Sequence, residues 1–352
     1  MALSEALPAR LRLPRPGLRL GLVALLILTA ALSIGTGAAG VSLSAVLGDL
    51  VAGTPLSARD RVVLFDIRLP RLAMGLLVGA ALAVAGALMQ GLFRNPLADP
   101  GIVGTGAGAG LGAVSAIVLG GLLPATIGAT LGPWLIPVAA FAGAWIVTLL
   151  LYRTARAGGE TSIATLLLAG IAFAALAGAV TGLLVAIADD QQLRDLTFWG
   201  MGSLAAASWP KLAVAALLII PALVFAPRLG AGLNALALGE AAASHMGHDV
   251  ERLKRRAVIA VAALSGAAVA LAGGIGFVGI VVPHLLRLAT GPDHRRLLPD
   301  AALLGAALLI AADLIARRVA APAELPIGII TALLGAPVFL WILLRRRGFG
   351  GL

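Results

Sequence analysis

The chain has 352 residues, of which 60% are hydrophobic and only 12% are charged, and its formal net charge is +10. Soluble domains are typically about 45–50% apolar and about 25% charged. A water-soluble fold could not bury this much apolar surface, so the expected solvent is a lipid bilayer. The absence of cysteine excludes disulfides, cysteine-based metal sites and thiol chemistry. Basic residues facing the cytoplasm explain the positive charge better than a nucleic-acid partner does.

Eight stretches are long and apolar enough to be read as membrane-spanning helices, which need about 20 apolar residues. In chain order they are Leu18–Ala39, Leu69–Gln90, Ile102–Leu123, Trp134–Tyr152, Ile163–Ile187, Leu212–Phe225, Ala301–Ala316 and Ile327–Leu344.

A ninth apolar run, Ala257–Leu288, is too long for one ordinary span and short for two. Gly273, Gly274 and Gly276 lie in its middle, and Pro283 lies near its end. This pattern predicts two shortened spans joined by a tight glycine turn inside the membrane, where irregular backbone is tolerated only if protein or a water-filled cavity surrounds it. The predicted fold class is therefore an all-α bundle of ten spans in a single domain, residues 1–352.

Basic residues at both ends of the chain indicate its orientation. An even number of spans places both termini on one side, and these ends carry Arg10, Arg12, Arg15, Arg19, Arg345, Arg346 and Arg347. The excess of arginine and lysine on the cytoplasmic side of membrane proteins predicts that both termini are cytoplasmic. Segment 1–17 is predicted to be a cytoplasmic extension and not a secretory signal, because no small-residue cleavage site follows it.

The chain lacks the residues that an ATPase or another enzyme would need. A phosphate-binding P-loop requires a lysine directly after a glycine, but the two lysines, Lys211 and Lys254, follow Pro210 and Leu253. No paired carboxylates, no nucleophile with a base and no metal-ligand cluster fall within the predicted spans. We therefore predict no catalytic residue, no metal site and no bound cofactor, and any energy from ATP must come from a partner chain.

The segment between the second and third spans carries the strongest motif, Met89-Gln90-Gly91-Leu92-Phe93-Arg94-Asn95-Pro96-Leu97-Ala98-Asp99-Pro100. Two prolines break the helix there, because proline lacks a donor and restricts the preceding residue. The glycines that follow, at 104, 106, 108, 110 and 112, predict a smooth helix face that another backbone can approach closely. By themselves these features predict only a tight hairpin with a packing face.

Together with other motifs, this segment resembles the FecCD-type permeases, which are the iron-siderophore, heme and cobalamin permeases of bacterial ABC importers. The further matching motifs are Arg68-Leu69-Pro70-Arg71, Leu238–Gly247, Gly274–His284, Glu324–Gly328 and Gly335–Phe339, and they follow one another in order over roughly residues 60–345. The resemblance implies the type II ABC importer fold with ten spans per subunit. It also implies a second copy of the chain, two ATPase subunits that bind ATP and magnesium, and a periplasmic binding protein, all at the bacterial inner membrane.

The resemblance implies a role for each of three groups of residues. Arg68, Arg71 and Arg317 match arginines that accept carboxylates of the binding protein, and a planar guanidinium suits that task. The alternative for these arginines is anchoring at the membrane interface by snorkelling. Asp313 lies four residues before Arg317, so an intrahelical pair is expected. The ATPase contact is predicted in the loop 236–250, through Leu238, Gly239, Glu240, Ala241, Ala242, Met246 and Gly247.

A cytoplasmic gate is expected at Asn95 and Leu97, and a second gate at Thr161–Thr165. At the second position Ile163 and Ala164 stand where a relative has small polar residues, which leaves the gate chemistry there open. The four histidines, at positions 245, 248, 284 and 294, are interpreted as loop or helix-end residues on the cytoplasmic side without a ligand role.

The segment Thr197–Leu204, followed by Trp209, looks most like the heme permeases, so heme is the predicted substrate. A ferric siderophore or cobalamin stays open as an alternative, and an ordinary interfacial role is an equal alternative for Trp199 and Trp209. A secondary transporter driven by an ion gradient is a more distant alternative, because it would need acidic or paired ionisable residues inside the membrane, and only Asp313 approaches that description.

Overall fold

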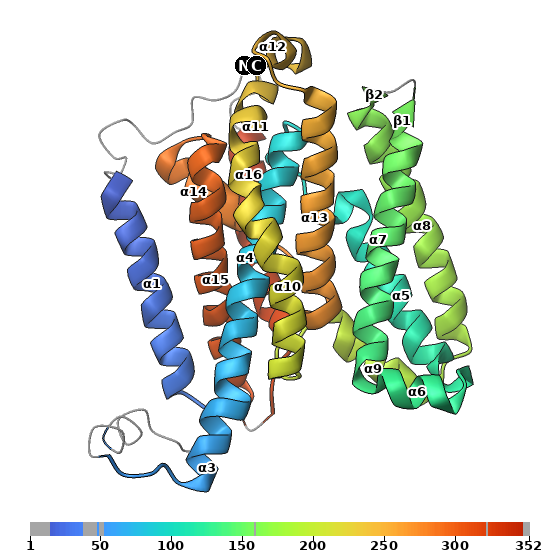
Figure 1. Ribbon diagram of the computed structural model, residues 1–352, viewed down its shortest axis with the longest axis vertical. Coiled ribbons are helices and arrows are strands. Elements are labelled where there is room, and N and C mark those ends of the chain that lie inside the picture. Colours follow the sequence, from blue (N-terminus) through green and yellow to red (C-terminus); the bar gives the residue numbers. More distant parts are fainter. Residues whose placement is uncertain (1–14, 38–47, 49–52, 158–159, 322, 348–352) are drawn as a thin grey trace.

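Helices make up almost all of the chain that the structure describes (Figure 1). The structure is a computed structural model, and it describes residues 15–37, 48, 53–157, 160–321 and 323–347. Most of the predicted segment 1–17, including Arg10 and Arg12, lies outside the described residues, as do Ala38 and Ala39 at the end of the predicted first span.

The long helices follow the predicted spans. In chain order they are α1 (Arg15–Gly35), α4 (Leu69–Leu92), α5 (Thr105–Leu119), α7 (Leu135–Ala155), α8 (Ile163–Ala186), α10 (Trp209–Phe225), α13 (Val250–Ala272), α14 (Val278–Thr290), α15 (His294–Val319) and α16 (Ile327–Arg347). Over the described ranges, eight helical stretches are long and apolar enough to cross a membrane, and two shorter apolar helices, Val278–Thr290 and Ile327–Trp341, bring the total to the ten that the sequence predicts.

Short elements complete the chain. They are α3 (Ala58–Arg61), a π-helical stretch (Val62–Arg68), 3-10 turns at Pro100–Val103, Gly120–Leu122, Gly132–Trp134 and Ala226–Leu229, α6 (Ala125–Leu131), α9 (Asp190–Gly200), α11 (Gly230–Leu236), α12 (Glu240–His245), and the strands β1 (Arg156–Ala157) and β2 (Glu160–Thr161). The strands form one antiparallel pair. In Figure 1, α12 and the start of α1 lie at one end of the bundle, whereas α3, α6 and α9 lie at the other.

Two predicted boundaries are wrong because apolar runs understate helices that begin with charged residues. Helix α13 begins at Val250, seven residues before the predicted Ala257, and with 23 residues it is not a shortened span. Helix α15 likewise begins at His294 and not at Ala301. Aspartates cap both helices, since Asp249 accepts from the Arg252 N–H and Asp293 from the Arg295 N–H.

The predicted glycine turn is present, and it separates α13 from the 13-residue α14. Gly273 has a φ of +73°, a conformation that favours glycine. Its neighbour Gly274 needs the lack of a side chain for another reason, because a Cβ there would overlap the carbonyl oxygen of Gly200. The turn therefore packs its backbone directly against the end of α9, a helix that the sequence did not predict.

Glycine also allows the closest helix contact outside the centre of the bundle. Helices α5 and α7 lie side by side, and a Cβ added at Gly108 or Gly112 would overlap the carbonyl oxygens of Gly143 or Ala139 on α7. Gly106 and Gly110 face open space. The prediction of a smooth glycine face is thus confirmed for two of the five positions, the two that another backbone actually reaches.

Helix α4 lies at the centre of the bundle, in contact with α10, α13, α14 and α15 (Figure 1). Most of its side chains are buried. By contrast, α8 buries only four residues and exposes large apolar ones, including Leu168, Ile171, Leu176 and Leu183. Exposed apolar faces of this kind fit a lipid environment or a second apolar chain.

Candidate functional site

Three arginines from three parts of the chain meet at the end of the bundle near α3. Arg68 is the last residue of the π-helical stretch, Arg71 lies in the first turn of α4, and Arg317 lies in the last turn of α15. The sequence predicted all three as docking residues, and the structure brings them together. All of them are largely buried, with Arg68 5% and Arg71 6% exposed.

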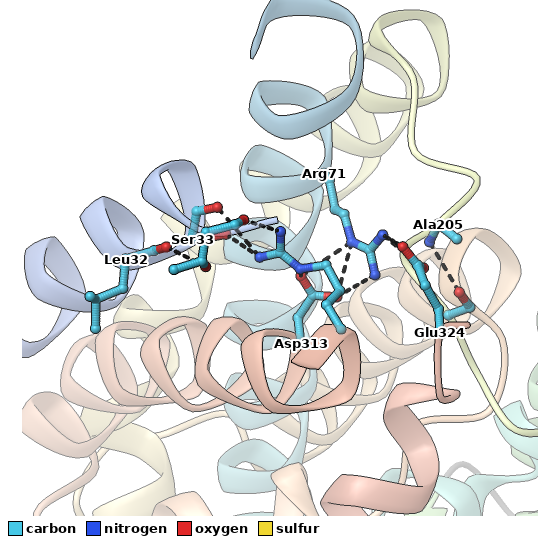
Figure 2. Close-up of polar contacts among 9 residues, drawn as sticks. Leu32, Ser33, Arg71, Ala205, Asp313 and Glu324 are labelled. Atoms are coloured by element: carbon cyan, nitrogen blue, oxygen red, sulfur yellow. Dashed lines mark hydrogen bonds and ion pairs between the residues drawn. The ribbon is translucent and has the colours of Figure 1, made fainter. Parts of the chain in front are cut away.

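Arg71 is held by two carboxylates (Figure 2). Its Nε and Nη2 donate to Asp313 over 3.0 and 2.8 Å, and its Nη1 donates to both oxygens of Glu324 over 2.8 and 2.9 Å. Asp313 is 2% exposed, whereas the side chain of Glu324 is 43% exposed. Arg71 therefore ties α4 to α15 on its buried side and to the segment before α16 on its outer side.

Arg317 and Arg68 bind the end of α1. Arg317 pairs with Asp313 over 3.0 Å, and it donates to the carbonyl oxygen of Thr36 over 3.0 Å and to the hydroxyl of Ser33 over 2.9 Å. Arg68 donates to the carbonyl oxygen of Ile34. Cations are favourable at a helix C-terminus, where the last carbonyl groups lack partners within the helix. The predicted pair between Asp313 and Arg317 is confirmed.

These contacts place the three arginines in one internal network of ion pairs and hydrogen bonds. The network has one solvent-exposed carboxylate, Glu324. The sequence indicated it only as part of the motif Glu324–Gly328 and not as a docking residue. No pattern in the sequence predicts its pairing with Arg71, because residues 71 and 324 are distant in the chain and meet only in the folded protein. A carboxylate that approaches Arg71 from outside meets Glu324 already bound there.

Directly after the C-terminal end of α4, the predicted gate residues lie in a tight turn. The side chain of Asn95 accepts from the Leu97 N–H over 3.0 Å, and Arg94 adopts a φ of +49°. Asn95 is exposed and Leu97 is half-buried. Two residues after Leu97, Asp99 caps the 3-10 turn Pro100–Val103 by accepting from the Gly101 N–H over 2.8 Å. Burial raises the pKa of the Asp99 carboxyl, and this hydrogen bond lowers it by a smaller amount.

Asp99 borders a cavity of about 380 Å³ between α5, α9, α13 and α14. Its lining residues include Trp199 and also Thr105 and Ser265, whose hydroxyls lie 3.2 Å apart. The residues around the cavity thus include an aromatic residue, two hydroxyl residues and an aspartate, together with the glycine turn. Such mixed linings are typical of sites that orient a small molecule or part of a larger one.

The predicted ATPase contact forms a short helix, α12, at one end of the bundle (Figure 1). Gly239 precedes it with a φ of +113°, and Met246 ends it. Leu238 and Met246 are 72% and 52% exposed. Ala241 and Gly247 are exposed as well, and Ala242 is half-buried. The side chain of Glu240 is 43% exposed and pairs with Lys254 of α13 over 2.8 Å.

The start of α8, where a second gate is predicted, is capped by Ser162, which accepts from the Thr165 N–H. Ile163 is half-buried and Ala164 is exposed, whereas Thr161 is 4% exposed. The helix also packs against Pro100–Val103, the 3-10 turn that follows Asn95 and Leu97. The turn that follows Asn95 and Leu97 therefore contacts the helix that begins in the second predicted gate segment.

His294 differs from its predicted setting in a loop. His294 is not a loop residue, since it begins α15, is 6% exposed and lies 3.0 Å from the Asn234 side chain through its Nδ1. Two opposing effects act on the pKa of the neighbouring Asp293. Burial raises the pKa of this carboxyl, but hydrogen bonds from Asn234 and the Arg295 N–H outweigh that and hold the pKa below its usual value. Within the described residues, no three histidine, aspartate or glutamate side chains group closely enough to hold a metal ion.

Comparison with known proteins yields consistent matches. The profile of the FecCD transport family matches residues 25–345. The hemin transport system permease protein HmuU of Yersinia pestis is 48% identical over 282 residues, which cover 80% of this chain and 83% of that protein. The vitamin B12 import system permease protein BtuC of Klebsiella pneumoniae is 44% identical over 299 residues, which cover 85% of this chain and 87% of that protein.

A solved structure has the same fold. It is described as a metal-chelate type ABC transporter in an inward-facing conformation, and it superimposes with a TM-score of 0.81 at 31% sequence identity. The superposition covers 94% of this chain and 99% of that one. The matches in sequence and in structure both extend over the whole bundle, so they concern the arrangement of all its spans and not one local motif.

Proposed function

Because this chain belongs to the FecCD transport family and is the permease subunit of an ABC importer, we propose that the substrate it imports is heme. The observation that carries this proposal is the 48% identity to the hemin permease, against 44% to the cobalamin permease. The segment Thr197–Leu204 supports it further, because it places Trp199 on the cavity beside Asp99. An indole ring suits a flat aromatic substrate, because aromatic rings attract one another in offset-stacked or edge-to-face arrangements.

Transport by the reconstituted importer tests the substrate. The chain, its ATPase and its binding protein in proteoliposomes are expected to accumulate hemin in an ATP-dependent manner and to exclude cyanocobalamin and ferric hydroxamates. Since each 1.4 kcal/mol of preference changes a rate tenfold, a preference of roughly tenfold or more is a fair threshold. Faster uptake of cobalamin or of a ferric siderophore would replace heme by that substrate and leave the importer assignment intact.

The proposed assembly contains two copies of this chain, two ATPase subunits and a periplasmic binding protein, in the bacterial inner membrane with both termini in the cytoplasm. The exposed apolar face of α8 supports a second copy at the translocation path. The exposed Leu238 and Met246 on either side of α12 support an ATPase contact there, because exposed apolar side chains are typical anchors of protein interfaces. Asn95 and Leu97 then gate the path at its inner end.

Docking of the binding protein is proposed at Arg68, Arg71 and Arg317, with Glu324 as an internal competitor. An incoming carboxylate reaches Arg71 by replacing the half-exposed Glu324, while the buried Asp313 stays bound. Planar guanidinium groups bind carboxylates through paired hydrogen bonds, so the exchange replaces one such pair by another.

The variant Glu324→Gln is therefore expected to bind the binding protein more tightly, by up to about fivefold, since an exposed ion pair is worth about 0–1 kcal/mol. The affinity is measured by surface plasmon resonance on the purified permease in nanodiscs. Asp195→Asn is the matched control, because it removes one exposed carboxylate from α9 at the same end of the bundle (Figure 1). Equal tightening in both variants would mean that only overall charge matters, and unchanged affinity for Glu324→Gln would contradict the competition.

A further inference from the structure

A buried lysine lies between the proposed ATPase contact and the proposed inner gate. Lys254, in the second turn of α13, is 2% exposed although its neighbours Arg255 and Arg256 are exposed. Lysine is rarely buried so completely unless it is paired. The positive-inside pattern explains the exposed arginines but gives no reason for a buried ammonium group.

All three donors of the ammonium group are used. The Nζ of Lys254 donates to Glu240 of α12 over 2.8 Å, to Glu251 of α13 over 2.9 Å and to the carbonyl oxygen of Thr161 over 2.8 Å. An ammonium group has three N–H donors and no acceptor, so the site is saturated. These three bonds join three different segments of the chain.

The bond to Thr161 is one of a set that fixes that residue to α13. The other oxygen of Glu251 accepts from the Thr161 N–H over 3.0 Å and from the Thr161 hydroxyl over 2.6 Å. The N–H, the carbonyl and the hydroxyl of Thr161 are therefore all bound by Glu251 or Lys254. Thr161 directly precedes Ser162, the capping residue of α8.

We propose that Lys254 is the positioning residue that transmits movement of α12 to the start of α8, and so couples the ATPase contact to the inner gate. This inference rests on the proposed function of α12 and of the segment 161–165. Separating α12 from α8 would leave a buried ammonium group without its full set of partners, which is strongly unfavourable. The two elements therefore move as one unit when the ATPase subunits close.

The variant Lys254→Met tests this in the complete importer, reconstituted with its ATPase and binding protein. We expect ATP hydrolysis without the binding protein to stay within roughly twofold of wild type. The stimulation of hydrolysis by the binding protein should fall at least roughly tenfold, because methionine has no N–H donors and no longer joins Glu240 of α12 to Thr161. Arg255→Met is the matched control, because it removes the same charge from the adjacent, exposed position, and it should keep full stimulation.

A distance measurement separates transmission of movement from a purely static role. The chain has no native cysteine, so spin labels at Ser244→Cys on α12 and Glu160→Cys on β2 report one distance by pulsed electron resonance. With Lys254 present, the distance distribution should be the same before and after ATP is added. In Lys254→Met it should broaden or shift on ATP binding.

Two results would overturn the proposal. One is a folded Lys254→Met variant with normal stimulation and an unchanged distance. The other is normal stimulation in Glu240→Ala, which removes the bond of Lys254 to α12 and tests the link even if Lys254→Met fails to fold. Absence of stimulation in the wild-type importer by any binding protein would contradict the proposed assembly. Such a result is distinct from the two that contradict the role of Lys254.

Discussion

Replacing Arg71 with methionine is expected to destabilise the folded permease by about 3–5 kcal/mol, the usual cost of removing one partner from a buried ion pair. The side chain is 6% exposed and binds Asp313, which is itself 2% exposed. Methionine fills similar volume but leaves Asp313 with Arg317 as its remaining charged partner. The loss should appear as a lower melting temperature in detergent and a smaller yield of monodisperse protein.

Glu324→Gln is the matched control for this effect. It removes the outer carboxylate of the same arginine, but Glu324 is half-exposed and water replaces its contact, so a change of about 0–1 kcal/mol is expected. If Arg71→Met were as stable as Glu324→Gln, the ion pair between Arg71 and Asp313 would not hold α4 to α15. Equal losses of stability in both variants would instead mean that the outer pair with Glu324 stabilises the protein as much as the inner pair with Asp313.

This expectation changes how charge reversal of the arginines can be interpreted. A variant that carries Arg71→Glu would bring a third carboxylate to Asp313 and Glu324, and like charges at that distance repel. Weak capture of the binding protein by such a variant would then reflect misfolding. Substitution of Glu324 avoids this difficulty, because it alters the exposed partner and leaves the buried pair in place.

The second large effect is expected at the contact between α5 and α7. Gly112→Ala should destabilise the protein by about 1–3 kcal/mol, as is typical of overpacking, because the added Cβ would overlap the carbonyl oxygen of Ala139. That oxygen belongs to a helix backbone, so it yields only if α7 moves as a whole. Thermal unfolding, followed by the fluorescence of an environment-sensitive dye or by size exclusion after heating, measures the change.

Gly110→Ala, two residues away on the same helix, should have the opposite sign. A Cβ there meets nothing within 4 Å, and alanine is more favourable than glycine in a helix by about 1 kcal/mol. The pair of variants therefore separates helix propensity from close packing with one chemical change. Destabilisation of similar size by both substitutions would contradict the contact, because it would point to a requirement for glycine along the whole face.

Much of the fold was predictable because the bilayer imposes a simple rule on the sequence. A span must be apolar over about 20 residues, so the approximate extents of α1, α4, α7, α8, α10 and α16 follow from hydropathy. The rule fails where a helix continues past its apolar stretch, and for this reason α13 and α15 begin seven residues earlier than their apolar runs. The amphipathic α9 was not predicted, because its 11 residues are polar on average and too few to span a membrane.

By itself, the sequence determined the class of protein, the number of spans and the motifs that mark the family, since these depend on composition and on residues close together in the chain. Only the tertiary structure decided which charges meet. Asp313 and Arg317 were paired in advance because four residues form one helical turn, but no local rule joins Arg71 to Glu324 or Lys254 to Thr161. Burial decides what such charges do, because an ammonium or guanidinium group removed from water must find partners inside the fold, and those partners come from whichever segments the packing of the helices has brought beside it.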